Sequence, residues 1–246
     1  MISVVTITYN NFSELKATLD SLTGVEGIES VVVNGGSCPS TLEFLSRWKG
    51  KSISEKDRGI SDAFNKGWRN SSGDAVAFLN SGDVLIEPSY YHKAQEVLDR
   101  NPDIDFVYAD IRFNHTLSGA YRMTPRGRDF SDLGKGVPFP HPSMVVRREI
   151  FEKLGGFSEA YRIAMDFDFV VRLLQAGYIG HYLPGEVVEM DGAGVSSTRE
   201  GEGIRECKTS LIEHGCYHGK IRWDFFMRMV RYRVRMGLQG KFKLSP

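Results

Sequence analysis

The sequence predicts an α/β fold in which helices cover both faces of a mainly parallel sheet. Through the first half of the 246 residues, short apolar runs alternate with stretches of helical periodicity. The apolar runs are rich in Val and Ile, and several end in Asn, Asp, Gly or Ser, which turn the chain after a strand. This alternation is typical of strand–helix–strand units, whose strands lie parallel.

In the first half, four predicted strands alternate with three predicted helices. A helix capped by Asn11 or Ser13 is predicted after the first strand, with leucines on one face and Gly24 at its end. The predicted strands are residues 2–8, 30–33, 52–53 and 74–79, and the next two predicted helices are residues 40–48 and 60–68.

The second half has a different order of elements. The segment 122–140 is rich in Gly, Pro and charge and is expected to be a loop, and long loops in compact domains are often functional. We expect a helix over 88–100, a strand over 105–113 that turns at 114–119 toward a partner strand, a strand over 143–146, and helices over 148–154 and 166–176.

Composition narrows the class of protein. Equal numbers of basic and acidic residues, 31 each, give a formal net charge of zero, which argues against a nucleic-acid-coating protein. Residues 220–246 nevertheless carry a net charge of +7.

Three cysteines without C-x-x-C spacing suit a reducing, cytoplasmic setting. The N-terminus has the pattern of a strand and no apolar run nears 18 residues, so we expect neither a secretory signal nor a transmembrane helix.

Polar residues follow four of the predicted strands. Ligands of open parallel sheets bind beyond the carboxyl ends of the strands, so these segments are expected to form one pocket. They lack G-x-G-x-x-G and G-x-x-x-x-G-K-[ST], so dinucleotide and Walker-type sites lose their main support. The segments are Thr8-Tyr9-Asn10, Asn34-Gly35-Gly36-Ser37, Asp57-Arg58 and Asn80-Ser81-Gly82-Asp83.

These side chains suit a nucleotide, although each is also an ordinary turn residue. The Tyr9 ring can stack on a base, and Asn34 can donate to and accept from a pyrimidine edge. Asp83 offers a hard oxygen ligand for a divalent cation.

Seven motifs in a fixed order link this chain to a known family. They are VVTITYN, VVVNGGS, SEKDRGISDAFNKG, GDAVAFLNSGD, PHPSMVVRREIFEKLGGF, AMDFDFVVRLL and DGAGVSS. In this order, over roughly residues 1–200, the chain resembles the family 2 glycosyltransferases of the GT-A fold. It is similar in particular to bacterial enzymes that assemble exopolysaccharides of the colanic acid type.

The resemblance implies a nucleotide-sugar site at the strand ends. Asn34 stands where the family usually has the aspartate that reads a uracil or guanine base. In the D-x-D region, Asn80 and Gly82 replace aspartates, and Asp83 corresponds to the retained ligand of Mn²⁺ or Mg²⁺. The implied donor-binding residues are Thr8, Tyr9, Asn10, Asn34, Gly35, Ser37, Asp57, Arg58, Asp62, Asn65, Lys66, Asn80, Ser81 and Gly82.

The resemblance also implies a catalytic base and an acceptor side. Asp166 begins an apolar helix, where a carboxylate is stabilised by the helix dipole, and it corresponds to the base of an inverting displacement. An aspartate at the start of a helix is also commonly only an N-cap residue with no catalytic role. Asp168 points away from Asp166 on a helix and is expected to make structural contacts at the acceptor side. His141, between two prolines, is expected in an extended segment bordering the acceptor. Ser196 and Ser197 match a lid over the donor.

The C-terminal segment has a helical pattern of its own. Apolar residues from Trp223 to Val234 follow one side, and Arg228, Arg231 and Arg235 form a separate row. A basic helix with Trp and Phe suits an anionic membrane surface, and also suits a helix packed on its own domain or an oligomer contact.

Together these features predict a metal-dependent, inverting glycosyltransferase. It would move a sugar from a UDP- or GDP-sugar to a hydroxyl of a lipid-linked glycan in bacterial polysaccharide biosynthesis. The expected division is a GT-A domain over 1–199, with a donor half 1–113 and an acceptor half 114–199, and a basic helical extension over 200–246. A sugar nucleotidyltransferase stays open as an alternative, although the first turn lacks its Gly-rich basic loop. So does a non-catalytic nucleotide-sugar- or glycan-binding relative, because of Asn34 and the thinned metal motif.

Overall fold

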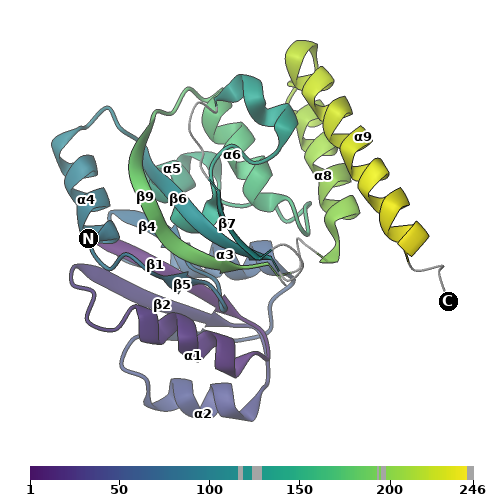
Figure 1. Ribbon diagram of the computed structural model, residues 1–246. Helices are drawn as coiled ribbons and strands as arrows, with labels where there is room; N and C mark the ends of the chain where they lie inside the picture. The colour runs from purple at the N-terminus through teal and green to yellow at the C-terminus, as the bar shows by residue number, and fades with distance from the viewer. Residues whose placement is uncertain (116–118, 124–128, 193, 195–197, 243–246) are drawn as a thin grey trace.

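The computed structural model describes residues 1–115, 119–123, 129–192, 194 and 198–242. Figure 1 shows a twisted sheet between layers of helices, with α8 (Glu200–Glu213) and α9 (Gly219–Phe242) lying together at one side of the molecule. None of the helices within these ranges combines the length and apolarity that crossing a membrane requires.

Nine strands in the described ranges form one sheet in the order β3-β2-β1-β4-β8-β6-β9-β5, with β7 paired to β6. The four strands β3, β2, β1 and β4 are parallel, as are β6 and β9, whereas β8, β7 and β5 pair antiparallel. The bounds are β1 Ile2–Thr8, β2 Ile28–Asn34, β3 Lys51–Ser54, β4 Ala75–Phe78, β5 Val84–Leu85, β6 Phe106–His115, β7 Gly119–Met123, β8 Val145–Arg147 and β9 Gly180–Asp191. The α/β class is confirmed, and the parallel pattern belongs mainly to the first half.

Helices cover both faces of this sheet and enclose two apolar cores. One core joins the sheet to α1, α2 and α4, and the other joins it to α3, α5, α6, α8 and α9. The bounds are α1 Phe12–Ser21, α2 Pro39–Arg47, α3 Ile60–Arg69, α4 Tyr90–Arg100, α5 Arg148–Leu154 and α6 Met165–Gln175, with 3₁₀ helices η1 Phe130–Lys135 and η2 His141–Ser143.

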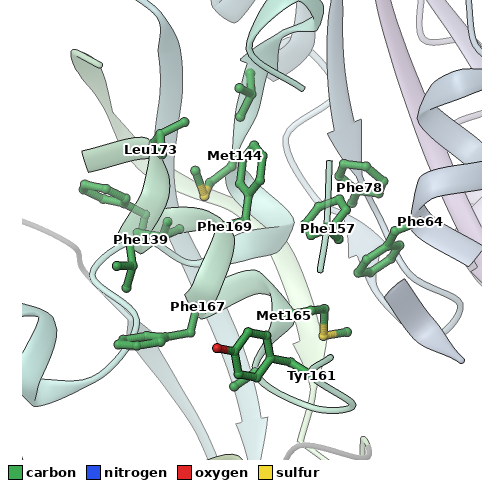
Figure 2. Close-up of a cluster of buried hydrophobic side chains, with 14 of the residues drawn as sticks. Phe64, Phe78, Phe139, Met144, Phe157, Tyr161, Met165, Phe167, Phe169 and Leu173 are labelled. Atoms are coloured by element: carbon green, nitrogen blue, oxygen red, sulfur yellow. The ribbon is translucent and has the colours of Figure 1, made fainter. Parts of the chain in front are cut away.

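The second core is dominated by aromatic rings from four parts of the chain. Figure 2 shows Phe64 of α3, Phe78 of β4, Phe157 of the segment between α5 and α6, and Phe169 of α6 gathered in one cluster. Phe157 lies 5.1 Å from Phe64, 5.1 Å from Phe78 and 5.0 Å from Phe169, measured between ring centroids. Each buried ring contributes roughly 1.5–3 kcal/mol relative to an exposed one. The cluster therefore fastens α6 to the parallel half of the sheet.

The two C-terminal helices complete this same core. Ile204 and Leu211 of α8 and Ile221 and Phe225 of α9 are buried in it. At Gly134, a Cβ atom would lie 2.2 Å from the backbone oxygen of Ile221, so only glycine permits the contact between η1 and α9. The segment predicted as an extension thus packs against the rest of the chain.

Several expected elements differ from the structure. The strands β5 and β9 were not anticipated, because β5 has two residues and Pro184-Gly185 and a register shift beside Asp110 interrupt the pattern of β9. The predicted loop 122–140 contains η1. His141 begins the short 3₁₀ helix η2, so the extended conformation expected for it is wrong.

Candidate active site

The polar ends of four strands lie at one edge of the sheet, as the sequence predicts. Thr8 pairs with Asn34, and Asn34 pairs with Ser54, so β1, β2 and β3 end side by side. On the other side of β1, the amide of Ser81 donates to the oxygen of Ile7 at 3.2 Å. The segments after β1, β2, β3 and β4 therefore adjoin one another.

The turn after β1 is held to the turn after β2. Asn10 has φ +55°, a left-handed conformation that Asn tolerates better than most residues. Its Oδ1 accepts from the amides of Ser37 at 2.9 Å and Cys38 at 3.0 Å. Next to it, the Tyr9 side chain is 67% exposed, which leaves its ring available to a ligand. Asn10 is thus a structural link beneath an accessible aromatic ring.

Asn34 and Gly35 pack tightly beneath the site. Asn34 is fully buried, its Oδ1 accepts from the amide of Gly36 at 3.1 Å, and its Nδ2 donates to Ser54 Oγ at 3.4 Å. A Cβ atom on Gly35 would lie 1.6 Å from Asp57 Oδ2, so the Asp57 carboxylate rests directly on the Gly35 backbone. A side chain at position 35 would have to displace the Asp57 carboxylate from the turn.

The residues predicted to bind the donor around the start of α3 differ in how far they are exposed. Arg58 is 72% exposed, and Lys66 joins Glu55 at 3.0 Å and Asp62 at 3.2 Å. Burial alone would raise the pKa of Asp62, but hydrogen bonds from Arg58 and Lys66 lower it to about 2. Asp62 is thus a buried anchor for both cations.

Asn65 is a core residue rather than part of the accessible surface. It is 2% exposed, donates to the oxygen of Phe157 at 2.8 Å, and accepts from the Phe157 amide at 2.9 Å and from Trp68 Nε1 at 3.0 Å. The structure therefore gives Asn65 the role of fastening α3 to the segment at Phe157, in contrast to the donor contact expected for it.

The turn after β4 keeps unsatisfied oxygen atoms near the same edge. Asp83 is buried, its Oδ2 accepts from the Asn80 amide at 3.2 Å, and the Gly82 amide donates to Thr18 Oγ1 at 3.0 Å. Asn80 Oδ1 and Ser81 Oγ are buried without a hydrogen-bond partner in the described part of the chain. In the same ranges no group of three or more His, Cys, Asp or Glu could hold a metal ion.

Asp166 lies in the first turn of α6 and is partly buried. Burial raises the pKa of its carboxyl group to about 6, against hydrogen bonds from the backbone amides of Phe167 and of Asp166 itself. The Phe167 amide donates to Oδ1 at 2.7 Å. A carboxylate with this pKa is ionised at neutral pH and basic enough to accept a proton from a hydroxyl in a transition state.

Two contacts join the start of α3 to the chain segment that leads to Asp166. Arg58 forms an ion pair with Glu159 at 2.8 Å. Ser61 Oγ donates to the backbone oxygen of Tyr161 at 3.0 Å. The strand-end region and the segment before α6 are therefore neighbours.

Asp168 makes the structural contacts that helical spacing predicts. It is 1% exposed, with Arg172 and His214 each at 2.9 Å and Ser210 Oγ donating to it at 3.0 Å. These partners come from α6, from α8 and from the turn after α8. Asp168 therefore holds α6 to α8 and has no surface for the acceptor contact that the resemblance implied.

His141 packs among aromatic rings. Its ring centroid lies 5.4 Å from Phe78, in a stacked arrangement, and 5.3 Å from Phe64. Burial lowers the pKa of His141 to about 4, so the ring is neutral at neutral pH. It can exchange a hydrogen bond with a ligand but does not bring a positive charge. Ser196 and Ser197, predicted as a lid, lie outside the described residues.

Glu206 and Arg228 were missed by sequence reasoning. Their charges act on Asp166, although they come from α8 and α9. A motif comparison that ends near residue 200 contains no signal for either, and helical periodicity alone assigned Arg228 to a basic outer row.

The sheet order and the strand-end site define a GT-A fold, and solved structures share it. Staphylococcus aureus TarS 1–349 superimposes with a TM-score of 0.68 at 16% identity, covering 92% of this chain and 71% of that one. The mannosyltransferase PcManGT of Pyrobaculum calidifontis, solved with GDP-Man and Mn²⁺, gives 0.64 at 18%, covering 96% and 75%. Glucosyl-3-phosphoglycerate synthase of Mycobacterium tuberculosis, solved with Mn²⁺, UDP and phosphoglyceric acid, gives 0.65 at 14%, covering 87% and 78%.

The chain belongs to glycosyl transferase family 2, whose model matches residues 3–155. A Haemophilus influenzae protein named as an uncharacterized glycosyltransferase is 26% identical over 184 residues, which are 71% of this chain and 62% of that protein. An M. tuberculosis protein, also named as an uncharacterized glycosyltransferase, is 29% identical over 225 residues, which are 81% and 78%. The chain therefore spans less than two thirds of the H. influenzae relative.

Proposed function

We propose that this protein transfers a sugar from a UDP- or GDP-sugar to a hydroxyl group of a glycan, with inversion at the anomeric carbon. The observation that carries the proposal is the partly buried Asp166, whose segment is tied by Arg58–Glu159 to the polar strand ends. Solved structures of the same fold with GDP-Man and with UDP support a nucleotide-sugar donor.

The donor would lie over the strand ends. The exposed Tyr9 ring is suited to stack on the base. Asn10, Asn34, Gly35 and Ser37 would shape the turns beneath it. Because the Asn34 side chain is fully buried and bonded within the turn, its proposed part is to hold the turn on which the base would lie.

A divalent cation, Mn²⁺ or Mg²⁺, fits the oxygen atoms of the turn after β4. The unsatisfied Asn80 Oδ1 and the Asp83 carboxylate are hard oxygen donors. One protein carboxylate is enough when diphosphate and water supply the other ligands. When bound, the cation neutralises charge that develops on the leaving diphosphate.

Asp166 would act as the general base. Its carboxylate takes the proton of the acceptor hydroxyl while that oxygen attacks the anomeric carbon from the face opposite the diphosphate. The bond between the anomeric carbon and the phosphate oxygen breaks, and the nucleoside diphosphate leaves with the bonding electrons. A single displacement inverts the configuration at carbon.

Two substitutions test these roles separately. Asp166→Asn should lower turnover by about 10²–10⁴-fold and leave donor affinity unchanged, because it removes the base alone. Asp83→Asn should weaken donor binding measured with Mn²⁺ and leave binding measured without metal nearly unchanged. The exposed Asp103→Asn is the matched control and should behave as wild type.

Thermal shift with UDP, GDP and their sugars, each with Mn²⁺ or Mg²⁺, would identify the donor class, because ligand binding stabilises the native state. Near-normal turnover in Asp166→Asn would refute the assignment of the base. Donor binding without turnover in wild type would favour a binding protein.

We further propose that the acceptor is lipid-linked and that α9 lies on the cytoplasmic surface of an anionic membrane. Trp223, Phe226 and Val230 are exposed at 62%, 53% and 37%, with Arg222 and Arg231 beside them. Aromatic and basic side chains on one helix suit the headgroup region. This arrangement would suit a bacterial exopolysaccharide assembled on a lipid carrier.

Vesicle flotation tests the membrane proposal. Wild type should bind vesicles containing anionic lipid and not neutral vesicles, and Trp223→Ser/Phe226→Ser should reduce binding. Leu42→Ser, an exposed apolar position on α2, is the control. Equal binding by the double variant and wild type would contradict a role for this surface.

A further inference from the structure

Helix α8 holds the chain segment just before the proposed base. The Glu206 carboxylate of α8 accepts hydrogen bonds from three successive backbone amides, at 3.0 Å from Arg162 and at 2.8 Å from both Ile163 and Ala164. Oε1 binds the first of these amides and Oε2 binds the other two. α6 begins at the next residue, Met165. Charge-assisted bonds to three successive amides fix this stretch of backbone against α8.

A second contact with α8 lies just before these amides. The Tyr161 hydroxyl donates to the carboxylate of Glu213, further along α8. The backbone oxygen of Tyr161 accepts from Ser61 Oγ of α3 at 3.0 Å. Tyr161 therefore joins α8 to the helix that follows the polar end of β3.

A third contact follows Asp166. The buried Asp168 accepts from Ser210 Oγ at 3.0 Å and lies 2.9 Å from His214 Nε2. The contacting residues of α8 and its C-terminal end recur at positions 206, 210, 213 and 214, the spacing of one helical face. One face of α8 therefore binds the chain both before and after Asp166.

We propose that α8 positions the catalytic base, with Glu206 as the positioning residue: its carboxylate fixes the backbone at the start of α6 and thereby the place of Asp166 relative to the donor. The inference rests on the proposed function of Asp166. Misplacing a reacting group by about 1 Å can lower a rate by about 10²-fold, so a loosened backbone here would lower turnover and leave the strand ends intact. The family model ends at residue 155, so α8 lies outside the family match.

Glu206→Gln tests this role, because a carboxamide has one acceptor oxygen where the carboxylate has two. At least one of the three amides then loses its partner. We expect kcat to fall by about 10- to 100-fold, while donor affinity, measured by calorimetric titration, stays as in wild type. Amide hydrogen exchange at residues 162–164 should be about 3- to 10-fold faster, the effect of losing one net hydrogen bond.

The matched control is Glu200→Gln on the same helix, where the carboxylate pairs with Arg235 of α9. It makes the same chemical change at a contact with α9. It should leave kcat and the exchange of amides 162–164 as in wild type.

A double-mutant cycle separates positioning from a general loss of structure. If Glu206 acts through Asp166, then Glu206→Gln in the Asp166→Asn background should change the single-turnover rate by no more than about twofold. A merely structural role would lower the rate by the same factor in both backgrounds, because independent effects add in free energy. Equal factors would therefore overturn the proposal.

The outcomes also distinguish this inference from the proposed function. Wild-type kcat in a folded Glu206→Gln protein would overturn the role of Glu206, even if transfer depends on Asp166. Near-normal turnover in Asp166→Asn would instead overturn the proposed base. If Glu206→Gln does not fold, Tyr161→Phe takes its place in the cycle, because it keeps the ring and removes the hydroxyl bonded to Glu213. Wild-type kcat in Tyr161→Phe would then overturn the positioning of Asp166 by α8.

Discussion

Asp166 combines partial burial with a place in the first turn of α6, and these two features act against each other. The amides of the helix start favour the carboxylate, whereas burial favours the neutral acid and raises its pKa to about 6. In the unfolded chain the same group titrates near 3.9. The native state therefore binds the proton more tightly than the unfolded state, and it loses stability as the pH rises through 6.

Asp166→Asn should consequently stabilise the protein while it lowers turnover. At pH 8 we expect a gain of about 1–3 kcal/mol in the free energy of unfolding, because a shift of one pKa unit corresponds to about 1.4 kcal/mol. The gain should shrink as the pH falls from 6 to 4, where wild-type Asp166 becomes protonated. Urea denaturation at several pH values measures it, with Asp103→Asn as control. A variant less stable than wild type at pH 8 would contradict the account.

The environment of His141 limits the part it can play at the site. A pKa of about 4 means that the ring brings no charge to a diphosphate at neutral pH. Its contacts with Phe64 and Phe78 make it part of the aromatic core and leave hydrogen bonding as the chemistry available to it.

At the scale of elements, the site depends on how closely neighbouring strand ends approach. The Asp57 carboxylate rests on Gly35, and Asn10 joins the turns after β1 and β2. These contacts leave little freedom to the segments that would hold the donor. The donor edge is therefore built mainly from contacts between turns, with few side chains exposed.

Gly35→Ala should disrupt this edge. The added methyl group would displace Asp57 and the turn after β3, so we expect donor affinity to fall by roughly tenfold or more and stability by about 1–3 kcal/mol. Calorimetric titration with the donor nucleotide and thermal melts measure both. Gly237→Ala, where the methyl meets nothing within 4 Å, is the control: it should leave donor affinity unchanged and should not lower stability, because Ala favours a helix. Unchanged affinity in Gly35→Ala would show that the turn is adaptable.

At the scale of the whole molecule, α9 has one face in the core and one face in solvent. Adjacent residues make the contrast: Phe225 is 2% exposed and Phe226 is 53% exposed. Arg235 forms an exposed ion pair with Glu200 of α8. Of the arginine row predicted from helical spacing, Arg231 and Arg235 are exposed and Arg228 is partly buried.

Phe225→Ala should lower the free energy of unfolding by about 3–5 kcal/mol, because it leaves a cavity between α9 and the rest of the core. Phe226→Ala should change stability little and should weaken vesicle binding if the membrane proposal holds. Chemical denaturation of both variants makes the comparison. Equal stability of the two variants would mean that α9 is not a part of the core.

The elements that could be predicted from the sequence are those whose signal lies in residues close together in the chain. The strands ending at Thr8, Asn34 and Ser54 and the helices beginning near Ile60 and Arg148 follow from periodicity and turn residues nearby in the chain. β5 was too short to have a pattern, and the bulge beside Asp110 interrupted the pattern of β9. Asn65 and Asp62 matched a motif in type, but only their partners show that they are buried.

The sequence by itself determined the α/β class, the resemblance to family 2 glycosyltransferases and the candidate carboxylate Asp166, because these depend on residue types at short spacings. The tertiary structure decided which polar residues are accessible, which face of α9 is buried, and which charges act on Asp166. Burial and charge act through space, and Glu206 binds the backbone amides just before α6 only because α8 packs against α6.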